Sequence, residues 1–292
     1  MSDLILHERP ELKRPVLIVA FGGWGDAGHS ATLAVQHLVK SWPATKFGEI
    51  DPDGYYDFTV ARPRVKIGED GQRQITWPSN TLFAYRGEPG EMDAILLLGI
   101  EPSLRWRSFA QEVVEVARSF DASMVVTLGA HFAPVSHADP VIISGWASPK
   151  ALHERMLSID IGSIGYEGPT GIATVVGSAL ADAGIPVAAL WAGVPAYLGG
   201  TPNPKGALAL VTRLERAFGL DLKTGNLNEA SQHFEASVTQ AIERIQSQHG
   251  GLKQLPAARP EAGDSASGPV ELPSPEDAVR AAEEFLRKNS AQ

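Results

Sequence analysis

Short apolar runs alternate along the chain with amphipathic stretches of helical period. The apolar runs are rich in Val, Ile, Leu and Ala, and they cover residues 16–21, 94–100, 123–128, 141–144 and 187–191. The amphipathic stretches follow short polar or Gly-rich loops, and they cover residues 30–40, 103–119, 170–183, 205–218 and 229–249. Strands that are apolar on both faces are typical of a sheet covered on both sides by helices. The alternation therefore predicts an α/β fold, with a mostly parallel sheet between two helical layers.

One segment departs from this alternation. From Tyr55 to Tyr85, apolar and polar side chains alternate on either side of the turn-like sequence Gly68-Glu69-Asp70-Gly71. A period of two around such a turn predicts an inserted β-hairpin.

The composition of the chain changes towards the C-terminus. Asn228 is expected to cap a helix that begins at Glu229 and that Gly250-Gly251 ends. Residues 250–272 are rich in Pro and Gly and contain no aromatic residue, which predicts a disordered linker. The pattern from Ser274 to Asp277 is that of a helix start. We therefore predict an α/β domain at 1–249, the linker at 250–272 and an amphipathic helix at 273–292. That helix either docks on a partner, packs on its own core or is marginally ordered.

Composition and charge exclude several classes of protein. The 292 residues include no Cys, which excludes disulfide scaffolds, Cys-ligated metal sites and thiol nucleophiles. The formal net charge of −9 disfavours binding to a nucleic-acid backbone, which needs a basic surface. The N-terminus lacks the pattern of a secretory signal, and the apolar runs are too short for a membrane span. We expect a cytoplasmic protein that contacts neither nucleic acid nor membrane.

A Gly-rich loop before the first helix is the sharpest local motif. Gly23, Gly25 and Gly28 fit the dinucleotide fingerprint G-x-G-x-x-G. Asp26 argues against a dinucleotide, because like charges about 4 Å apart repel by roughly 4 kcal/mol at an effective dielectric near 20. An Asp at this place suits a helix cap, or a partner for a ligand hydroxyl or ammonium group. Dinucleotide binding, helix capping and ligand binding all stay open here.

Further polar candidates fall near the ends of predicted strands. Glu101 and Arg105 join the 94–100 run to its helix, either as a local ion pair or as ligand groups. Thr170 precedes another helix, where it could cap the helix or help to hold an anion. His131 and Tyr197 follow later apolar runs. Because ligands of open α/β sheets bind beside the carboxyl ends of the strands, we expect these candidate ligand-binding side chains to share one rim.

Aromatic residues also gather near strand ends. The four tryptophans there are Trp24, Trp106, Trp146 and Trp191. An aromatic rim suits a pocket or a protein interface. His131 and His137 lack a convincing third ligand nearby, so no metal site is expected. The chain also lacks a nucleophile elbow, a P-loop and an H-E-x-x-H motif, and no cofactor is expected.

Several short segments form a specific combination. They are GGWGDAG at 22–28, DF at 57–58, RP at 62–63, ITWP at 75–78, GIEPSLRW at 99–106, YEGPTG at 166–171 and PNPK at 202–205. Together they resemble the PAC2 family, in its actinobacterial branch, from Pro15 to Leu220. The family is named after proteasome assembly chaperone 2.

The resemblance implies a fold and a class of partner. The implied fold is a three-layer α/β/α sandwich similar to the nucleoside phosphorylase/hydrolase type. It also implies a homo-oligomer, with a trimer as the favoured form, and some relatives act as assembly factors for proteasome subunits. Relatives that dock on the proteasome tend to end in a hydrophobic-Tyr-any residue tail, whereas this chain ends Asn289-Ser290-Ala291-Gln292, so docking by that route is not expected.

Three hypotheses for the function follow. The first is a non-catalytic protein-binding or assembly factor, resembling a proteasome assembly chaperone, with proteasome subunits as the partner. The second is an enzyme or binding protein for a nucleoside-like small molecule that uses the strand-end rim. The third is dinucleotide binding at the Gly-rich loop. We favour the first, because the absence of Cys and of common catalytic motifs leaves few groups for chemistry. No residue is assigned a catalytic role.

Overall fold

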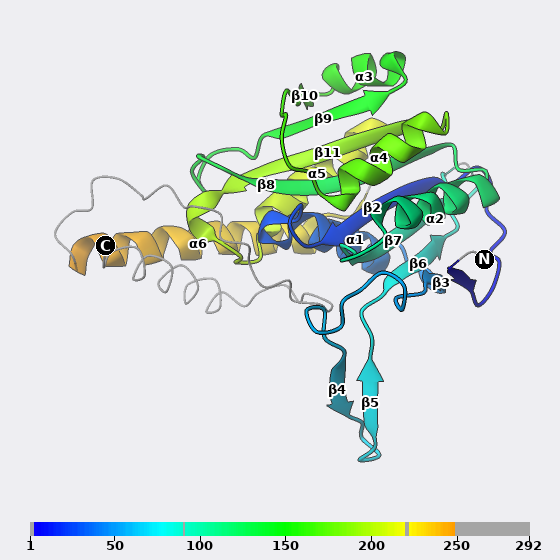
Figure 1. Ribbon diagram of the computed structural model, residues 1–292. Helices are drawn as coiled ribbons and strands as arrows, with labels where there is room; N and C mark the ends of the chain where they lie inside the picture. Colours follow the sequence, from blue (N-terminus) through cyan, green and yellow to red (C-terminus); the bar gives the residue numbers. More distant parts are fainter. Residues whose placement is uncertain (1–2, 90, 220–221, 249–292) are drawn as a thin grey trace.

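The computed structural model describes residues 3–89, 91–219 and 222–248 (Figure 1). Its strands are β1 (Leu4–Leu6), β2 (Val16–Gly22), β3 (Thr45–Ile50), β4 (Arg64–Ile67), β5 (Arg73–Thr76), β6 (Asn80–Tyr85), β7 (Ala94–Ile100), β8 (Met124–Ala133), β9 (Ile143–Ser148), β10 (Gly162–Ser163) and β11 (Val187–Pro195). Its α-helices are α1 (Ser30–Ser41), α2 (Trp106–Ser119), α3 (Lys150–Leu157), α4 (Ile172–Asp182), α5 (Pro204–Phe218) and α6 (Gly225–Gln248). Two short 3-10 helices are η1 (Ala27–His29) and η2 (Ala196–Leu198).

One large sheet contains nine of these strands, in the order β1-β3-β6-β7-β2-β8-β11-β9-β10. The four central strands β7, β2, β8 and β11 are parallel to one another. On either side, β6 and β9 run antiparallel to their central neighbours. The predicted α/β class is confirmed. The sheet is mixed rather than mostly parallel, because short connections such as the one between β6 and β7 join antiparallel strands.

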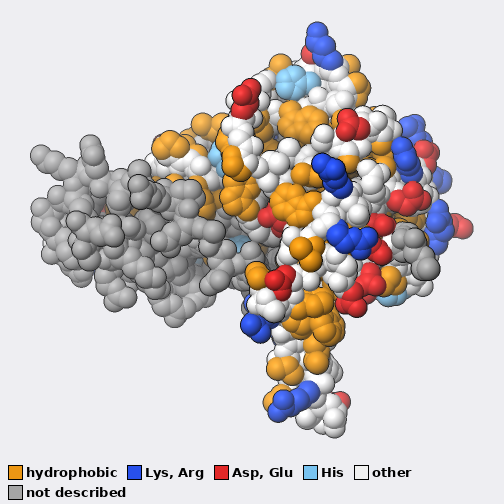
Figure 2. Space-filling model, in the orientation of Figure 1, with side chains coloured by type: hydrophobic (Ala, Val, Ile, Leu, Met, Phe, Trp, Pro, Cys, Tyr) orange, Lys and Arg blue, Asp and Glu red, His pale blue; other side chains and the backbone are white. Residues whose placement is uncertain are grey.

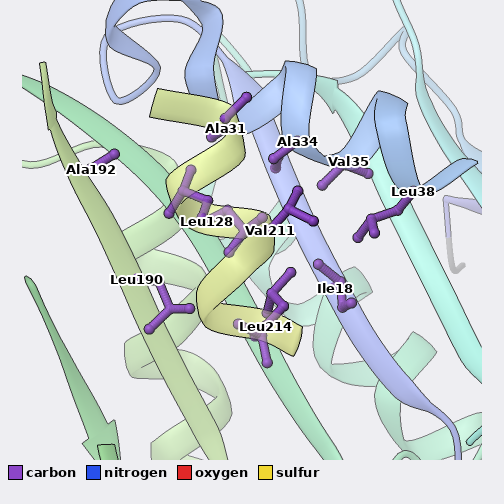
Figure 3. Packing of buried hydrophobic residues seen from close by; sticks show 14 of the residues in the cluster. Ile18, Ala31, Ala34, Val35, Leu38, Leu128, Leu190, Ala192, Val211 and Leu214 are labelled. Atoms are coloured by element: carbon purple, nitrogen blue, oxygen red, sulfur yellow. The ribbon is translucent and has the colours of Figure 1, made fainter. Parts of the chain in front are cut away.

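The central strands are buried on both faces, and successive residues enter different cores. In β2, one core receives Val16, Ile18 and Ala20 and the other receives Leu17, Val19 and Phe21. Figure 3 shows the first core, in which apolar side chains of β2, β8 and β11 face those of α1 and α5. The second core lies under α2 and α4. Two helical layers therefore account for the nearly continuous apolar strands of the sequence.

All the predicted strands and helices of the α/β domain occur, with shifts at their ends. The structure adds β1, β3, β6, β10 and α3, which the pattern did not predict. These four strands lie towards the two edges of the sheet, where strands do not need continuous apolar runs. The predicted start of α6 is wrong, because the helix begins at Gly225 and the Asn228 N–H already donates to the Thr224 carbonyl. Its predicted end at Gly250-Gly251, the linker and the C-terminal helix lie outside the described residues.

The inserted hairpin is confirmed, but it is shorter than the predicted segment. β4 and β5 pair with each other around the Gly68–Gly71 turn, and they form a separate two-stranded sheet. The last part of the predicted segment is β6, which pairs with β7 in the large sheet. In Figure 1 the hairpin projects away from the rest of the protein.

Candidate functional site

The carboxyl ends of β7, β2, β8 and β11 lie along one edge of the molecule, which we call the rim. The rim comprises the loops that follow these strands, the loop before α4 and the start of the antiparallel strand β9. Three of the predicted features meet there. A Cβ atom on Gly23 would lie 3.0 Å from the Glu101 Cβ, and one on Gly171 would lie 3.0 Å from the Glu101 Oε1. Glu101 therefore joins the Gly-rich loop to the start of α4.

The Gly-rich loop is in tight contact with its neighbours. Gly28 has a φ of 59°, in the left-handed region, and a Cβ atom there would lie 2.9 Å from the Asn203 Cβ. A Cβ atom on Gly25 would lie 3.2 Å from the Trp191 ring. These glycines thus allow other parts of the protein to approach closely, which is a common reason for glycine in a turn.

Asp26 is buried at the start of α1 and is 4% exposed. Its Oδ1 accepts hydrogen bonds from the backbone N–H groups of Ala31 at 2.7 Å and Thr32 at 3.3 Å. Its Oδ2 accepts a third from the Thr32 hydroxyl at 2.5 Å. Burial raises the pKa of the Asp26 carboxyl, and the Thr32 hydroxyl and the nearby His29 oppose that rise. The carboxylate takes the amides that a bound pyrophosphate would need, which favours helix capping over dinucleotide binding.

Glu101 has a similar role at the start of α4. Its Oε1 accepts a hydrogen bond from the Ile172 N–H at 2.7 Å, and its Oε2 accepts one from the Trp24 N–H at 3.4 Å. Burial raises the pKa of the Glu101 carboxyl, and these two hydrogen bonds act in the opposite direction. Both candidate acids of the rim are therefore engaged with helix N-termini of the protein itself.

Arg105 and Thr170 differ from the predictions. The Arg105 guanidinium lies 3.5 Å from the Asp3 carboxylate and 5.1 Å from the centre of the Tyr55 ring. Of the two alternatives that the sequence left open for Glu101 and Arg105, the local ion pair does not form, because Arg105 pairs instead with Asp3, which precedes the unpredicted strand β1. Thr170 is exposed, and the residue that precedes the first turn of α4 is Gly171. Thr170 is therefore not the cap, and the Glu101 carboxylate takes that role.

His131 and Tyr197 lie at the ends of neighbouring strands but in different environments. His131 is exposed on β8, opposite Gly193 of β11. Tyr197 is buried, and its hydroxyl oxygen accepts a hydrogen bond from the His137 N–H at 2.8 Å. The same hydroxyl lies 2.6 Å from the His137 Nδ1. Tyr197 is therefore part of an internal hydrogen-bonded cluster, whereas His131 is accessible.

The cluster around His137 and Tyr197 also forms contacts with helix α6. The His137 Nε2 hydrogen-bonds to the Thr239 hydroxyl at 2.9 Å. The Lys205 Nζ donates to the His137 carbonyl at 2.5 Å and pairs with Glu235 of α6 at 2.5 Å. Burial lowers the pKa of His137. The sequence around His137 indicates at most a metal ligand. Its partners Tyr197 and Thr239 lie far from it along the chain, so no local pattern identifies them.

The rim exposes large apolar side chains rather than its candidate acids. The exposed fractions are 58% for Trp24, 53% for Leu104, 64% for Ile142 and 61% for Tyr166. The other tryptophans near strand ends are half-buried. The Trp106 Nε1–H donates to the Pro102 carbonyl at 2.6 Å. The predicted aromatic rim is thus a mixed apolar rim, with Trp24 as its most exposed tryptophan.

Within the described residues, no three His, Asp or Glu side chains lie close enough together to hold a metal ion. None of the helices described is both long enough and apolar enough to cross a bilayer.

Comparison with protein families identifies the chain. The model of the PAC2 family matches residues 20–242, which include the large sheet from the end of β2 onward, the hairpin and most of the helices. The chain belongs to the PAC2 family. It is 41% identical to a PAC2 family protein from Streptomyces avermitilis, with a TM-score of 0.73 over 77% of this chain and 95% of that one. It is 37% identical to a proteasome-assembly chaperone homologue from Mycobacterium tuberculosis, with a TM-score of 0.71 over 77% of this chain and 94% of that one.

More distant proteins share the fold alone. An archaeal proteasome activator from Pyrococcus furiosus is 18% identical, with a TM-score of 0.66 over 85% of this chain and 100% of that one. A search of curated proteins gave no significant match. The predicted family is therefore confirmed, and the two similar actinobacterial structures agree with the branch that the motifs indicated.

Proposed function

We propose that this PAC2 family protein is a non-catalytic binding or assembly factor that holds a protein partner on its rim. The observation that carries the proposal is a contrast between the candidate acids, whose oxygens accept hydrogen bonds inside the protein, and the apolar side chains, which are exposed. Trp24, Leu104, Ile142 and Tyr166 are each more than half exposed on the rim. Aromatic and large apolar side chains of this kind are typical of the centres of protein interfaces, where they supply most of the binding energy.

The positions of the candidate acids support a role without chemistry. A general acid or base must lie within hydrogen-bond reach of its substrate. The Asp26 carboxylate is buried with three internal donors, and both oxygens of Glu101 face backbone N–H groups. Tyr197 and His137 are hydrogen-bonded to each other inside the protein. These groups maintain the shape of the rim, and the apolar side chains are left to make contacts.

The partner that we propose is a proteasome subunit. The similar Mycobacterium tuberculosis protein is described as a proteasome-assembly chaperone homologue, which supports this choice. We also propose that the protein works in the cytoplasm as a homo-oligomer, with the trimer that the family resemblance implies. An apolar rim repeated on each copy would present several contact sites to a ring of proteasome subunits.

Binding of purified proteasome subunits from the same organism to the immobilised full chain tests this function. The test variant is Trp24→Ser combined with Leu104→Ser, because both side chains are exposed and neither belongs to a buried core. The matched control is Leu157→Ser at the end of α3, where Leu157 is 48% exposed away from the rim. Removing an exposed interface tryptophan typically costs about 2 kcal/mol or more, so the double variant should bind at least about thirty-fold more weakly.

The possible outcomes test the docking site and the identity of the partner separately. Loss of binding in the double variant, with the control unchanged, supports the rim as the docking site. Equal binding by the double variant and the wild type contradicts the rim, and absence of binding by the wild type contradicts the proteasome as partner. Circular dichroism of each variant shows whether its fold is intact.

A further inference from the structure

A groove separates the edge strand β1 from helix α2. β1 is the outermost strand on one side of the large sheet, and among the described strands it pairs only with β3. Figure 1 shows β1 in dark blue beside the label N, at the edge of the sheet. The groove has a volume of about 450 Å³, and the N-terminal segment and the second half of α2 line it. The rim lies at the start of α2, so the groove is a separate surface.

The two walls of the groove are attached to each other at both ends. At one end, the Asp3 N–H donates to the Glu112 Oε1 at 3.2 Å. At the other end, the Arg9 guanidinium donates to the Ser119 carbonyl at 2.5 Å and lies 4.9 Å from the centre of the Phe120 ring. β1 and α2 therefore run in the same direction along the groove, and these contacts fix its shape.

The backbone of β1 offers hydrogen-bonding groups at its free edge. The Asp3 carbonyl accepts from the Asp51 N–H of the neighbouring chain segment at 2.8 Å. The His7 N–H donates to the Phe47 carbonyl, also at 2.8 Å. Hydrogen-bonded and non-hydrogen-bonded pairs alternate along antiparallel strands, so Leu6, next to His7, points its N–H and C=O away from β3. An exposed edge of this kind is a template on which another extended segment can pair.

The floor of the groove is apolar. Leu4 and Leu6 are half-buried and pack against the core under α2. Val114 of α2 lines the same groove and is buried. Because alternate side chains of a strand point to the same face, a strand added to β1 would place every second side chain over this floor.

Charged side chains of both signs follow the wall that α2 forms. Glu115 and Arg118 line the groove and are exposed. In the part of the chain that the structure describes, neither of them nor Arg9 takes part in a salt bridge. Arg118 lies next to Ser119, at the end where Arg9 is attached, whereas Glu115 lies about one turn nearer to Glu112. Figure 2 shows acidic and basic side chains gathered at the right of the view, where Figure 1 places α2 and the N-terminal segment. One end of the groove thus favours an acidic group and the other a basic group.

We infer that the groove binds an extended segment of a partner protein, which adds a strand to the free edge of β1. The segment runs antiparallel to β1, because that direction gives the more stable pairing. It therefore begins at the end with Arg9 and Arg118 and continues towards Glu115. An acidic side chain, an apolar side chain two positions later and a basic side chain two positions after that match the charges and the floor in this order. The inference rests neither on the rim nor on the proposed function.

The spacing of the charges agrees with this arrangement. Glu112 and Arg118 are about 9 Å apart along the helix axis, at 1.5 Å per residue. The first and last of five strand residues are about 13 Å apart. The long side chains of an acid and a lysine at those two positions bridge the difference.

Isothermal titration calorimetry of the full chain with two synthetic peptides tests the site. The first peptide, acetyl-SETVTKS-amide, has the acid, the apolar residue and the base in the inferred order. The second, acetyl-SKTVTES-amide, has the same composition in reverse order. We expect the first to bind at least about tenfold more tightly, because reversal brings like charges together at both ends of the groove.

A charge exchange locates the acidic end of the peptide. Arg118→Glu should weaken binding of the first peptide by at least about tenfold. A peptide with lysine in place of its glutamate, acetyl-SKTVTKS-amide, should bind this variant more tightly than it binds the wild type. Arg107→Glu is the matched control, because Arg107 is exposed on the same helix but does not line the groove. This control should bind the first peptide as the wild type does.

A second pair of variants tests the strand pairing. Leu6→Pro removes the N–H that faces the free edge, and an edge strand tolerates proline where the missing N–H is not used by the neighbouring strand. Leu6→Ala is its control, because it removes the same apolar contacts but keeps the N–H. The first peptide should bind Leu6→Pro at least about threefold more weakly than Leu6→Ala. If urea unfolding shows that Leu6→Pro does not fold, the charge exchange decides the question.

Three results would overturn the inference. These are absence of peptide binding by the wild type, equal affinity for the two peptide orders, and equal binding by folded Leu6→Pro and Leu6→Ala. A second copy in the groove would also reject it, and would appear as a lower mass of Arg118→Glu in sedimentation equilibrium without any peptide binding. The Trp24→Ser and Leu104→Ser double variant leaves the groove intact, so it should bind the first peptide normally. This last result separates the groove from the rim.

Discussion

Removing the Asp26 carboxylate tests the capping role directly. In the folded protein this carboxylate accepts hydrogen bonds from two backbone N–H groups and one hydroxyl, all at the start of α1. In Asp26→Ala these three buried donors lose their acceptor. If Asp26 instead bound a hydroxyl or amine group of a ligand, the result would differ. Asp26→Asn would then abolish ligand binding without changing the stability of the folded protein.

The expected loss of folding free energy in Asp26→Ala follows from the donors that the substitution leaves without an acceptor. Hydrogen bonds to a charged group contribute about 1.5 to 3 kcal/mol each, but burying the carboxylate has its own cost. Loss of a helix cap costs about 0.5 to 2 kcal/mol. Two orphaned backbone donors and one hydroxyl therefore give a net loss of about 3 kcal/mol for Asp26→Ala. Asp26→Asn keeps an oxygen that can accept from both N–H groups, so it should lose only about 1 kcal/mol.

Thermal and urea unfolding of the full chain measure these losses. For a domain of this size, 3 kcal/mol lowers the midpoint of thermal unfolding by about 6 to 12 °C. Asp53→Ala is the matched control, since it removes an exposed carboxylate and should change stability by less than about 0.5 kcal/mol. The capping argument is refuted if Asp26→Ala is as stable as this control, or if Asp26→Asn is destabilised as much as Asp26→Ala.

Three further predictions concern other parts of the fold. Glu101→Ala should destabilise the protein by about 1 to 2 kcal/mol in urea unfolding, because the start of α4 loses its acceptor, and Glu101→Gln should restore most of that loss. The pKa of His137 is lowered by burial, so the unfolded state takes up a proton first as pH falls below 6.5. Stability should therefore fall from pH 6.5 down to the folded pKa, and His137→Gln should remove this part of the pH dependence in urea titrations. Gly129→Ala places a Cβ atom 2.6 Å from the Trp191 ring and should cost about 1 to 3 kcal/mol, whereas Gly200→Ala meets nothing within 4 Å and should be close to neutral.

Much of the central fold could be predicted from local patterns. Strands buried on both faces need apolar residues at nearly every position, as in β2 and β7, so they are visible without knowledge of their neighbours. The edge strand β3 has the sequence TKFGEI, with two exposed residues at its start, and such a strand resembles a loop. It is recognised only through its pairing with β6 and β1.

The sequence predicts where the candidate residues lie, but not which groups they contact. Asp26, Glu101 and Arg105 do lie at the rim, because residues that follow parallel strands meet at one edge of the sheet. Their partners are distant along the chain: Ile172 for Glu101 and Asp3 for Arg105. A sequence motif of fixed, short spacing cannot identify partners that lie so far apart along the chain.

The sequence by itself determined the α/β class, the hairpin and the family, because hydrophobic period and short motifs are local properties of the chain. Tertiary structure decided which polar groups are free to bind. Asp26 and Glu101 look like ligand groups in the sequence, yet the fold brings the N-termini of α1 and α4 onto them and occupies their oxygens. The same fold leaves Trp24 at the rim and Ile75 on the hairpin uncovered. Burial depends on what the rest of the chain places over a residue, and that is fixed only when the layers pack together.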